Sequence, residues 1–141
     1  MLDAIVGYKQ QQAAAKQAKI IGEYNAKVAE NEAVILRRQK VDEEASLRQN
    51  SERLVSTQRV ATAASGITMS GSPMQAMADA YFNTEMDALR IQYAGDIAEA
   101  AKISEANLAR AGGQARATAY KMQSYQTLLE GAQKTASSLM A

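Results

Sequence analysis

Helix-breaking residues are concentrated at the midpoint of this 141-residue chain. The stretch AASGITMSGSPM, residues 63–74, holds the one proline, Pro73, and two of the eight glycines, Gly66 and Gly71. Proline lacks a backbone N–H, and glycine costs about 1 kcal/mol relative to alanine inside a helix. The sequence therefore permits long helices on both sides of the midpoint but interrupts them there.

The composition on both sides favours helices over strands. Alanine is the commonest residue, only 5% of residues are aromatic, and there is no tryptophan. Residues that fill sheets are scarce relative to good helix formers. The expected fold class is all-α, with alanine-rich faces along which helices can approach closely because each alanine is small.

The breakers also specify how one helix ends and the next begins. Gly66 follows the expected end of the first helix, where a left-handed conformation costs glycine little. Ser72 can cap the second helix, Pro73 fits its first position, and Gln75 completes a capping box. The residues assigned to the turn and helix start are Gly66, Gly71, Ser72, Pro73 and Gln75.

A connection this short returns the chain antiparallel to itself. We therefore expect a long antiparallel helical hairpin that forms a single domain over residues 1–141. Its first arm covers about 4–65, its turn 66–72 and its second arm about 73–139.

The second arm carries apolar residues at helical spacing from Phe82 to Ala136, which predicts a long packing helix. Two adjacent glycines cost about 2 kcal/mol relative to alanine. We expect them to kink or break this arm at Gly112-Gly113. Gly95 and Gly131 allow two interpretations, close contact with the other arm or tolerated surface glycine.

A two-helix hairpin with small seam residues buries too little surface to be stable alone. Each arm of about 60 to 65 residues would be about 90 to 100 Å long if straight. The missing burial must come from copies of the chain or from a partner, so the hairpin is expected to assemble into an oligomeric bundle or ring.

Methionine and isoleucine gather around the turn. This tip consists of Ile67, Met69, Met74 and Met77. Methionine adapts to irregular surfaces. The tip can serve as a docking point for a partner, or it can simply seal the end of the hairpin.

The residue types needed for most enzymatic sites are missing. The chain has no histidine and no cysteine, which removes the usual zinc ligands and the bases of serine and cysteine triads. The two glycines of the turn lack the lysine of a phosphate-binding loop. We expect no enzymatic activity, no metal and no cofactor.

Charge and hydropathy indicate neither a nucleic-acid partner nor a membrane span. Sixteen basic and fifteen acidic residues leave a net charge of +1, so no field attracts nucleic acid, and no specific recognition of it is expected. Apolar runs fall short of the ~20 residues that a spanning helix needs. The start MLDAIVGYKQQQ lacks the basic and apolar regions of a signal peptide.

One segment resembles a known family. The run from Gln58 to Pro73 places an arginine shortly before AASG, and an SGSP turn before a second helix. It is similar to small internal virion, or ejection, proteins of short-tailed bacteriophages. The paired arginines Arg37-Arg38 and the later Glu43-Glu44-Ala45 also fit, and the resemblance covers about residues 10–135.

The resemblance implies a function and a set of partners. Such proteins lie inside the capsid near the portal, leave the virion at infection, and help to form a conduit for the genome across the host envelope. The implied partners are copies of the chain, the portal protein, other internal virion proteins and the host envelope membrane. The implied location is the virion, and after ejection the host periplasm or envelope.

Two other interpretations stay open. The chain could be a portal or tail adaptor that is never ejected. It could also be a secreted helical-hairpin protein of bacterial type VII systems, although that class carries a Trp-x-Gly turn and this chain has no tryptophan.

Overall fold

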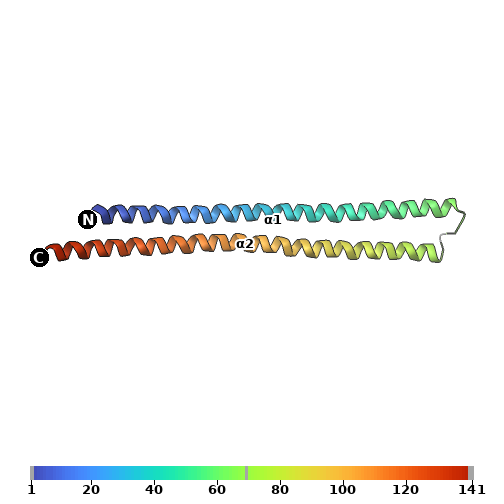
Figure 1. Ribbon diagram of the computed structural model, residues 1–141. Helices are drawn as coiled ribbons and strands as arrows, with labels where there is room; N and C mark the ends of the chain where they lie inside the picture. The colour runs from blue at the N-terminus through green and yellow to red at the C-terminus, as the bar shows by residue number, and fades with distance from the viewer. Residues whose placement is uncertain (1, 69, 140–141) are drawn as a thin grey trace. The chain divides into compact units, whose positions relative to one another are not determined.

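The computed structural model describes residues 2–68 and 70–139 and consists of two helices. Helix α1 spans Leu2–Ala64 and helix α2 spans Ser72–Leu139, and they pack against each other as a hairpin (Figure 1). No strand occurs within these residues. The predictions of an all-α fold and of a helical hairpin are confirmed, with α1 starting two residues and α2 one residue earlier than expected.

Contacts between the two helices group into two units. The terminal unit comprises Met1–Asn31 with Lys102–Ala141, and the turn unit comprises Glu32–Ala101. Each unit contains one stretch of α1 and one stretch of α2, and each is described by itself below. The expectation of a single domain stays a prediction.

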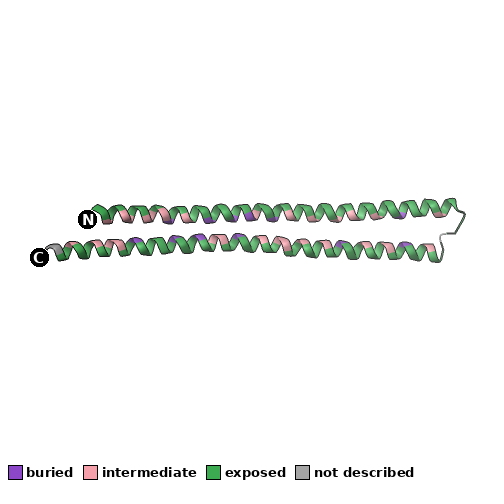
Figure 2. Ribbon diagram, viewed as in Figure 1, coloured by how far each residue is buried: buried purple, intermediate pink, exposed green. Residues whose placement is uncertain are grey.

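Small side chains form the buried seam between the helices. In the terminal unit they are Ala15, Ala26, Ala29, Ala106 and Ala117. The turn unit buries Ala33, Val55, Met77 and Ala88. Figure 2 shows buried segments, in purple, on the facing sides of the two ribbons. Alanine seams bring helices close together, but they bury little apolar area per residue.

The seam on α2 repeats every 11 residues. Met77, Ala88 and Glu99 are each 11 residues apart and all lie at buried or half-buried positions. Eleven residues in three turns give about 3.67 residues per turn, which is close to the 3.6 of a straight helix and differs from the 3.5 of a heptad seam. Helices with this period can pack side by side without left-handed supercoiling.

The expected break at Gly112-Gly113 does not occur, since α2 is continuous from Ser72 to Leu139. Gly113 instead lies in the seam of the terminal unit, opposite Gly22. A Cβ atom built on Gly113 would lie 2.9 Å from the Gly22 Cα and 3.0 Å from the Ala18 carbonyl oxygen. The absence of a side chain lets the two backbones touch, and packing of the helices outweighs the helix propensity of the glycine pair.

The apolar stripe predicted to pack in the second arm faces away from α1. Phe82, Met86, Leu89, Tyr93 and Ile97 are all exposed, and the seam passes through the smaller residues between them. Both stripes step by three and four, so spacing alone did not separate them. The structure places mainly small residues in the seam and this stripe of large ones outside.

Candidate functional site

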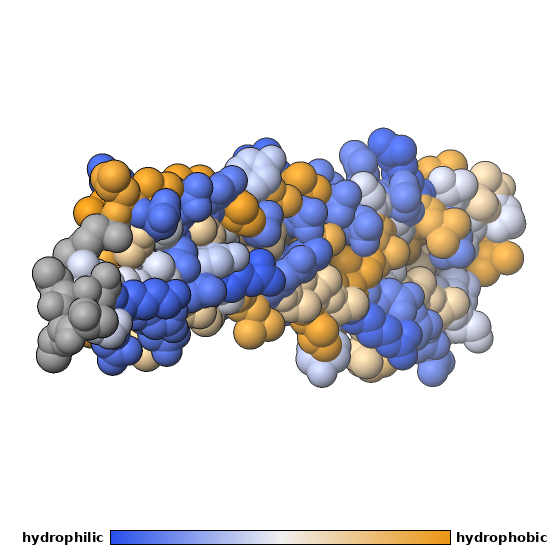
Figure 3. Space-filling view, turned by 60° about the vertical axis from the view of Figure 1, so that its left-hand side comes forward, coloured by the Kyte–Doolittle hydropathy of each residue, from blue (hydrophilic) through white to orange (hydrophobic). Residues whose placement is uncertain are grey.

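Large apolar side chains lie on the outside of both units. In the turn unit they form a stripe on α2, defined here as the outer stripe: Phe82, Met86, Leu89, Tyr93 and Ile97. Tyr93 is 70% exposed and Phe82 is 67% exposed. Figure 3 shows hydrophobic residues at the surface, interspersed with hydrophilic ones. Apolar surface of this extent marks a binding face more often than a free surface.

The terminal unit also exposes large apolar residues, on both of its helices. On α1 these are Ile20, Tyr24 and Val28, and on α2 they are Leu108, Met122 and Leu129. Tyr8 and Tyr125 come together across the two helices, with ring centroids 6.4 Å apart and tilted by 55°. Such an aromatic pair adds to helix packing beyond its buried area.

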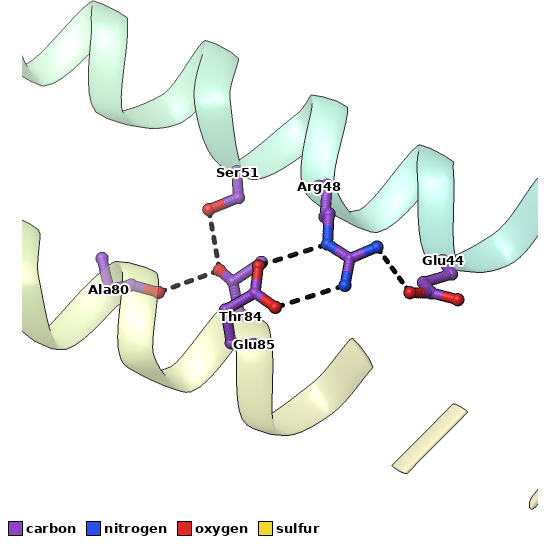
Figure 4. A network of polar contacts seen from close by, with 6 residues as sticks. All are labelled: Glu44, Arg48, Ser51, Ala80, Thr84 and Glu85. Atoms are coloured by element: carbon purple, nitrogen blue, oxygen red, sulfur yellow. Dashed lines mark hydrogen bonds and ion pairs between the residues drawn. The ribbon is translucent and has the colours of Figure 1, made fainter. Parts of the chain in front are cut away.

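A polar network joins the helices in the turn unit (Figure 4). Arg48 of α1 donates two hydrogen bonds of 3.2 Å to the two carboxylate oxygens of Glu85 of α2 and also pairs with Glu44. Thr84 donates to the Ala80 carbonyl oxygen at 2.8 Å, so the 2.7 Å contact with Ser51 uses the Ser51 hydroxyl as donor. The two parallel hydrogen bonds from Arg48 to Glu85 fix which residues of the two helices face each other.

A second network in the turn unit lies around Gly95. Arg37 pairs with Glu99, and Lys40 pairs with Asp96 and lies 3.8 Å from a Glu99 oxygen. A Cβ atom on Gly95 would meet the Lys40 side-chain carbons at 2.5 to 2.9 Å. Gly95 is therefore a close-contact glycine, which leaves room for the Lys40 stem to reach across the seam.

A third network joins the helices in the terminal unit. Arg110 of α2 pairs with Glu23 at 2.7 Å and with Glu30 at 2.6 Å, both on α1. Further toward the chain ends, a Cβ atom on Gly131 would lie 2.5 Å from the Ala4 Cβ, so Gly131 is also a close-contact glycine. These contacts set the register of the antiparallel pair in this unit.

The ion pairs shift the pKa values of their members in the directions that favour charge. Hydrogen bonding to Arg48 lowers the pKa of Glu85, and hydrogen bonding to Arg37 lowers that of Glu99. The hydrogen bond to Asp96 raises the pKa of Lys40. Each charged group is thus stabilised by its counterpart on the other helix.

The sequence analysis does not predict these networks. A usable signal was present, because Lys40, Glu44, Glu99 and Arg110 stand at seam positions of the helices and are half-buried. A charge at a seam position needs a partner across the seam. Matching such charges between antiparallel arms would have found the pairs.

The five residues assigned to the turn and helix start lie in the turn unit. Gly66 has φ of 70° and Gly71 has φ of 82°, both in the left-handed region. The Gln75 backbone N–H donates to the Gly71 carbonyl oxygen at 3.1 Å, so Gly71 holds the cap position and Ser72 is the first helical residue. Pro73 follows, half-buried.

The described residues of the expected tip differ in exposure. Ile67 and Met74 are exposed, whereas Met77 is buried in the seam. Met69 lies outside the described residues. Met74 and Met77 line a shallow, mainly apolar depression together with Arg59, Ala78 and Tyr81. Met77 therefore closes the hairpin, while Met74 is open to contact.

Among residues 2–68 and 70–139, no helix is long and apolar enough to cross a membrane. The same residues contain no group of three or more acidic side chains placed to hold a metal ion.

Comparisons of the chain with protein-family models, with curated proteins and with solved structures give no match.

Proposed function

We propose that this chain is a non-enzymatic structural subunit that assembles with copies of itself, and that it serves as an internal virion protein of a short-tailed bacteriophage. In this role it lies near the portal, in contact with the portal protein and other internal virion proteins. It leaves the capsid at infection and helps to form a conduit for the genome across the host envelope.

The observation that carries the assembling role is the inverted placement of side chains. Most buried residues of the seam between α1 and α2 are alanine or glycine, while most of the tyrosine, leucine and isoleucine side chains and the one phenylalanine are exposed or half-buried. Burying a large apolar side chain contributes about 1.5 to 3 kcal/mol, so the strongest source of stability in this chain is unused within the hairpin.

The total surface supports the same conclusion. The chain exposes 10365 Å². A globular monomer of 15.2 kDa exposes about 7,100 Å². The excess of about 3,000 Å² per chain is somewhat more than the roughly 1,000 to 2,500 Å² that each chain buries in an obligate homodimer.

The assignment to a virion rests on the resemblance of the segment from Gln58 to Pro73. The turn that this segment encodes, with left-handed Gly66 and Gly71, is compatible with that assignment. A hairpin with a small-residue seam also suits passage through a narrow portal, because it needs no large globular core.

The virion role is tested by mass spectrometry of particles of the virus whose genome encodes this chain, before and after triggered genome release. The chain is expected in full particles and depleted from emptied ones. Retention in emptied particles would indicate the alternative role, a portal or tail adaptor. Absence from full particles would refute both virion roles.

A further inference from the structure

The outer stripe on α2 lies on the side of the helix opposite α1. Each of its residues is two positions from a buried or half-buried seam residue; Tyr93, for example, lies between Ile91 and Gly95. Two residues correspond to about 200° around a helix. The stripe therefore cannot be covered by α1 of the same unit.

The equivalent side of α1 in the turn unit is polar over the length of the stripe. Two positions beyond its seam residues lie these exposed side chains: Arg38, Asp42, Ser46, Gln49, Arg53 and Thr57. The exposed apolar residues on this side, Ile35 and Val60, lie at its two ends. An apolar stripe gains nothing from packing on charged and amide groups, since those groups would lose water without a partner. Within the turn unit, the outer stripe of a second copy is therefore the continuous apolar surface that matches it in length and character.

From these two faces we infer that the turn unit forms a two-fold interface between two copies of the chain, α2 against α2. The inference rests on the self-assembly proposed above and names its surface. The contact is isologous, with the same five residues on both sides: Phe82, Met86, Leu89, Tyr93 and Ile97. An isologous contact closes on itself, so this interface gives a dimer rather than a growing filament.

The area of the stripe suffices for such an interface. The exposed fractions of its residues run from 39% at Met86 to 70% at Tyr93. At roughly 200 Å² for a large side chain, the stripe offers about 600 Å² per copy. Two copies would bury about 1,200 Å², which exceeds the roughly 1,000 Å² expected of a biological interface.

Several charges beside the stripe are already paired within one copy. Glu85 pairs with Arg48 and Asp96 pairs with Lys40, both across to α1, while Asp87 pairs with Arg90 on α2. A second copy can approach without leaving these groups uncompensated. The 11-residue period also lets two copies of α2 lie side by side over the length of the stripe.

Leu89 is the middle residue of the stripe, so it meets its counterpart whether the two helices run parallel or antiparallel. The test uses the full chain in sedimentation equilibrium, with Leu89→Asp as the variant and Gln49→Asp as the matched control on the polar side of α1. We expect the dimer dissociation constant to rise at least about 100-fold in Leu89→Asp, because two carboxylates would face each other. Gln49→Asp should leave it unchanged.

Cysteine cross-linking provides a second readout that does not depend on a disruptive substitution. The chain has no native cysteine, so Leu89→Cys and Gln49→Cys each introduce a single thiol. Under mild oxidation Leu89→Cys should form disulfide-linked dimers and Gln49→Cys should not. Equal cross-linking of the two variants, or association of Leu89→Asp as tight as that of the unmodified chain, overturns this interface while leaving self-assembly intact. A full chain that stays monomeric up to about 100 μM, a concentration well above most specific affinities, overturns both this interface and the proposed self-assembly.

Discussion

Gly112 and Gly113 are neighbours in the sequence and have opposite surroundings in α2. Gly113 is buried against Gly22, whereas a Cβ atom on Gly112 would meet nothing within 4 Å. The sequence presents them as one helix-weakening pair. At the scale of single residues, only the contact across the seam distinguishes the glycine that packing requires from the one that merely lowers helix propensity.

The first prediction compares alanine at these two positions. Gly113→Ala should destabilise the hairpin by about 1 to 3 kcal/mol, because its methyl group would overlap the backbone of Gly22 and neither backbone can yield without separating the helices. Gly112→Ala should stabilise it by about 0.5 to 1 kcal/mol through helix propensity alone. Urea unfolding followed by circular dichroism measures both, and equal effects of the two substitutions would contradict the assigned packing.

The second prediction concerns the thermal stability of the hairpin at low pH. The pKa values of Glu85 and Glu99 are lowered from 4.5 in the folded hairpin, so the folded state holds protons less tightly than the unfolded chain. Their ion pairs therefore contribute stability above pH 4.5, and this contribution is lost as the pH falls through the lowered values. The Tm should fall below pH 4.5 and stay level just above it.

The control is the double variant Glu85→Gln with Glu99→Gln, whose Tm should fall less steeply in acid. About 1 M salt should also reduce the difference, since the pairs lie near the surface and the Debye length is then about 3 Å. An unchanged acid profile in the double variant would show that other carboxylates cause the transition.

Helix α2 carries two stripes with the same spacing, the seam that packs on α1 and the outer stripe. Which of them is buried depends on the packing of the whole helix. The side of α2 that packs on α1 carries mainly small residues, and the large residues of the outer stripe face away, although hydropathy alone favours burying large residues. Close approach of the two backbones, as at Gly22 and Gly113, and ion pairs such as Arg48 with Glu85 both require the small seam. The turn between the helices is equally specific, because Gly66 and Gly71 both have positive φ.

The third prediction tests the turn as an element boundary. Nothing lies within 4 Å of a Cβ atom placed on Gly66, so any cost of a side chain there arises from its φ of 70°. Gly66→Ala should destabilise the hairpin by about 1 to 2 kcal/mol, and Gly66→Asn by clearly less, because asparagine tolerates the left-handed region. Thermal unfolding of the two variants measures this, and a larger loss for asparagine would rule out backbone strain as the cause.

For the whole molecule, the balance between buried and exposed surface governs behaviour. The chain exposes 10365 Å², and its charges nearly cancel at +1. Low net charge offers little repulsion between copies, and exposed apolar stripes attract them. Association between copies should thus contribute a large part of the free energy that stabilises the folded chain.

The fourth prediction follows from the contribution of association to the stability of the folded chain. Because association favours the folded state by mass action, the Tm of the full chain should rise with protein concentration. A series of melts over about two decades of concentration measures the dependence, and Leu89→Asp should flatten it. A Tm independent of concentration would show that the hairpin is stable as a monomer.

The sequence by itself determined the helices and the fold class. The concentration of breakers around Gly66, Gly71 and Pro73 specified where α1 ends and α2 begins, because proline and positive φ act locally. A short connection then required an antiparallel return. These features depend on neighbours in the chain, so they could be inferred without any tertiary contact.

The tertiary structure decided which face of each helix is inside. Two stripes with equal spacing are indistinguishable along a single helix, and their roles separate only when the partner helix occupies one of them. For the same reason Gly112-Gly113 was read as a break, and the partners of Lys40 and Arg110 were not identified. Contacts between residues far apart in the sequence carry this information, and no local pattern encodes it.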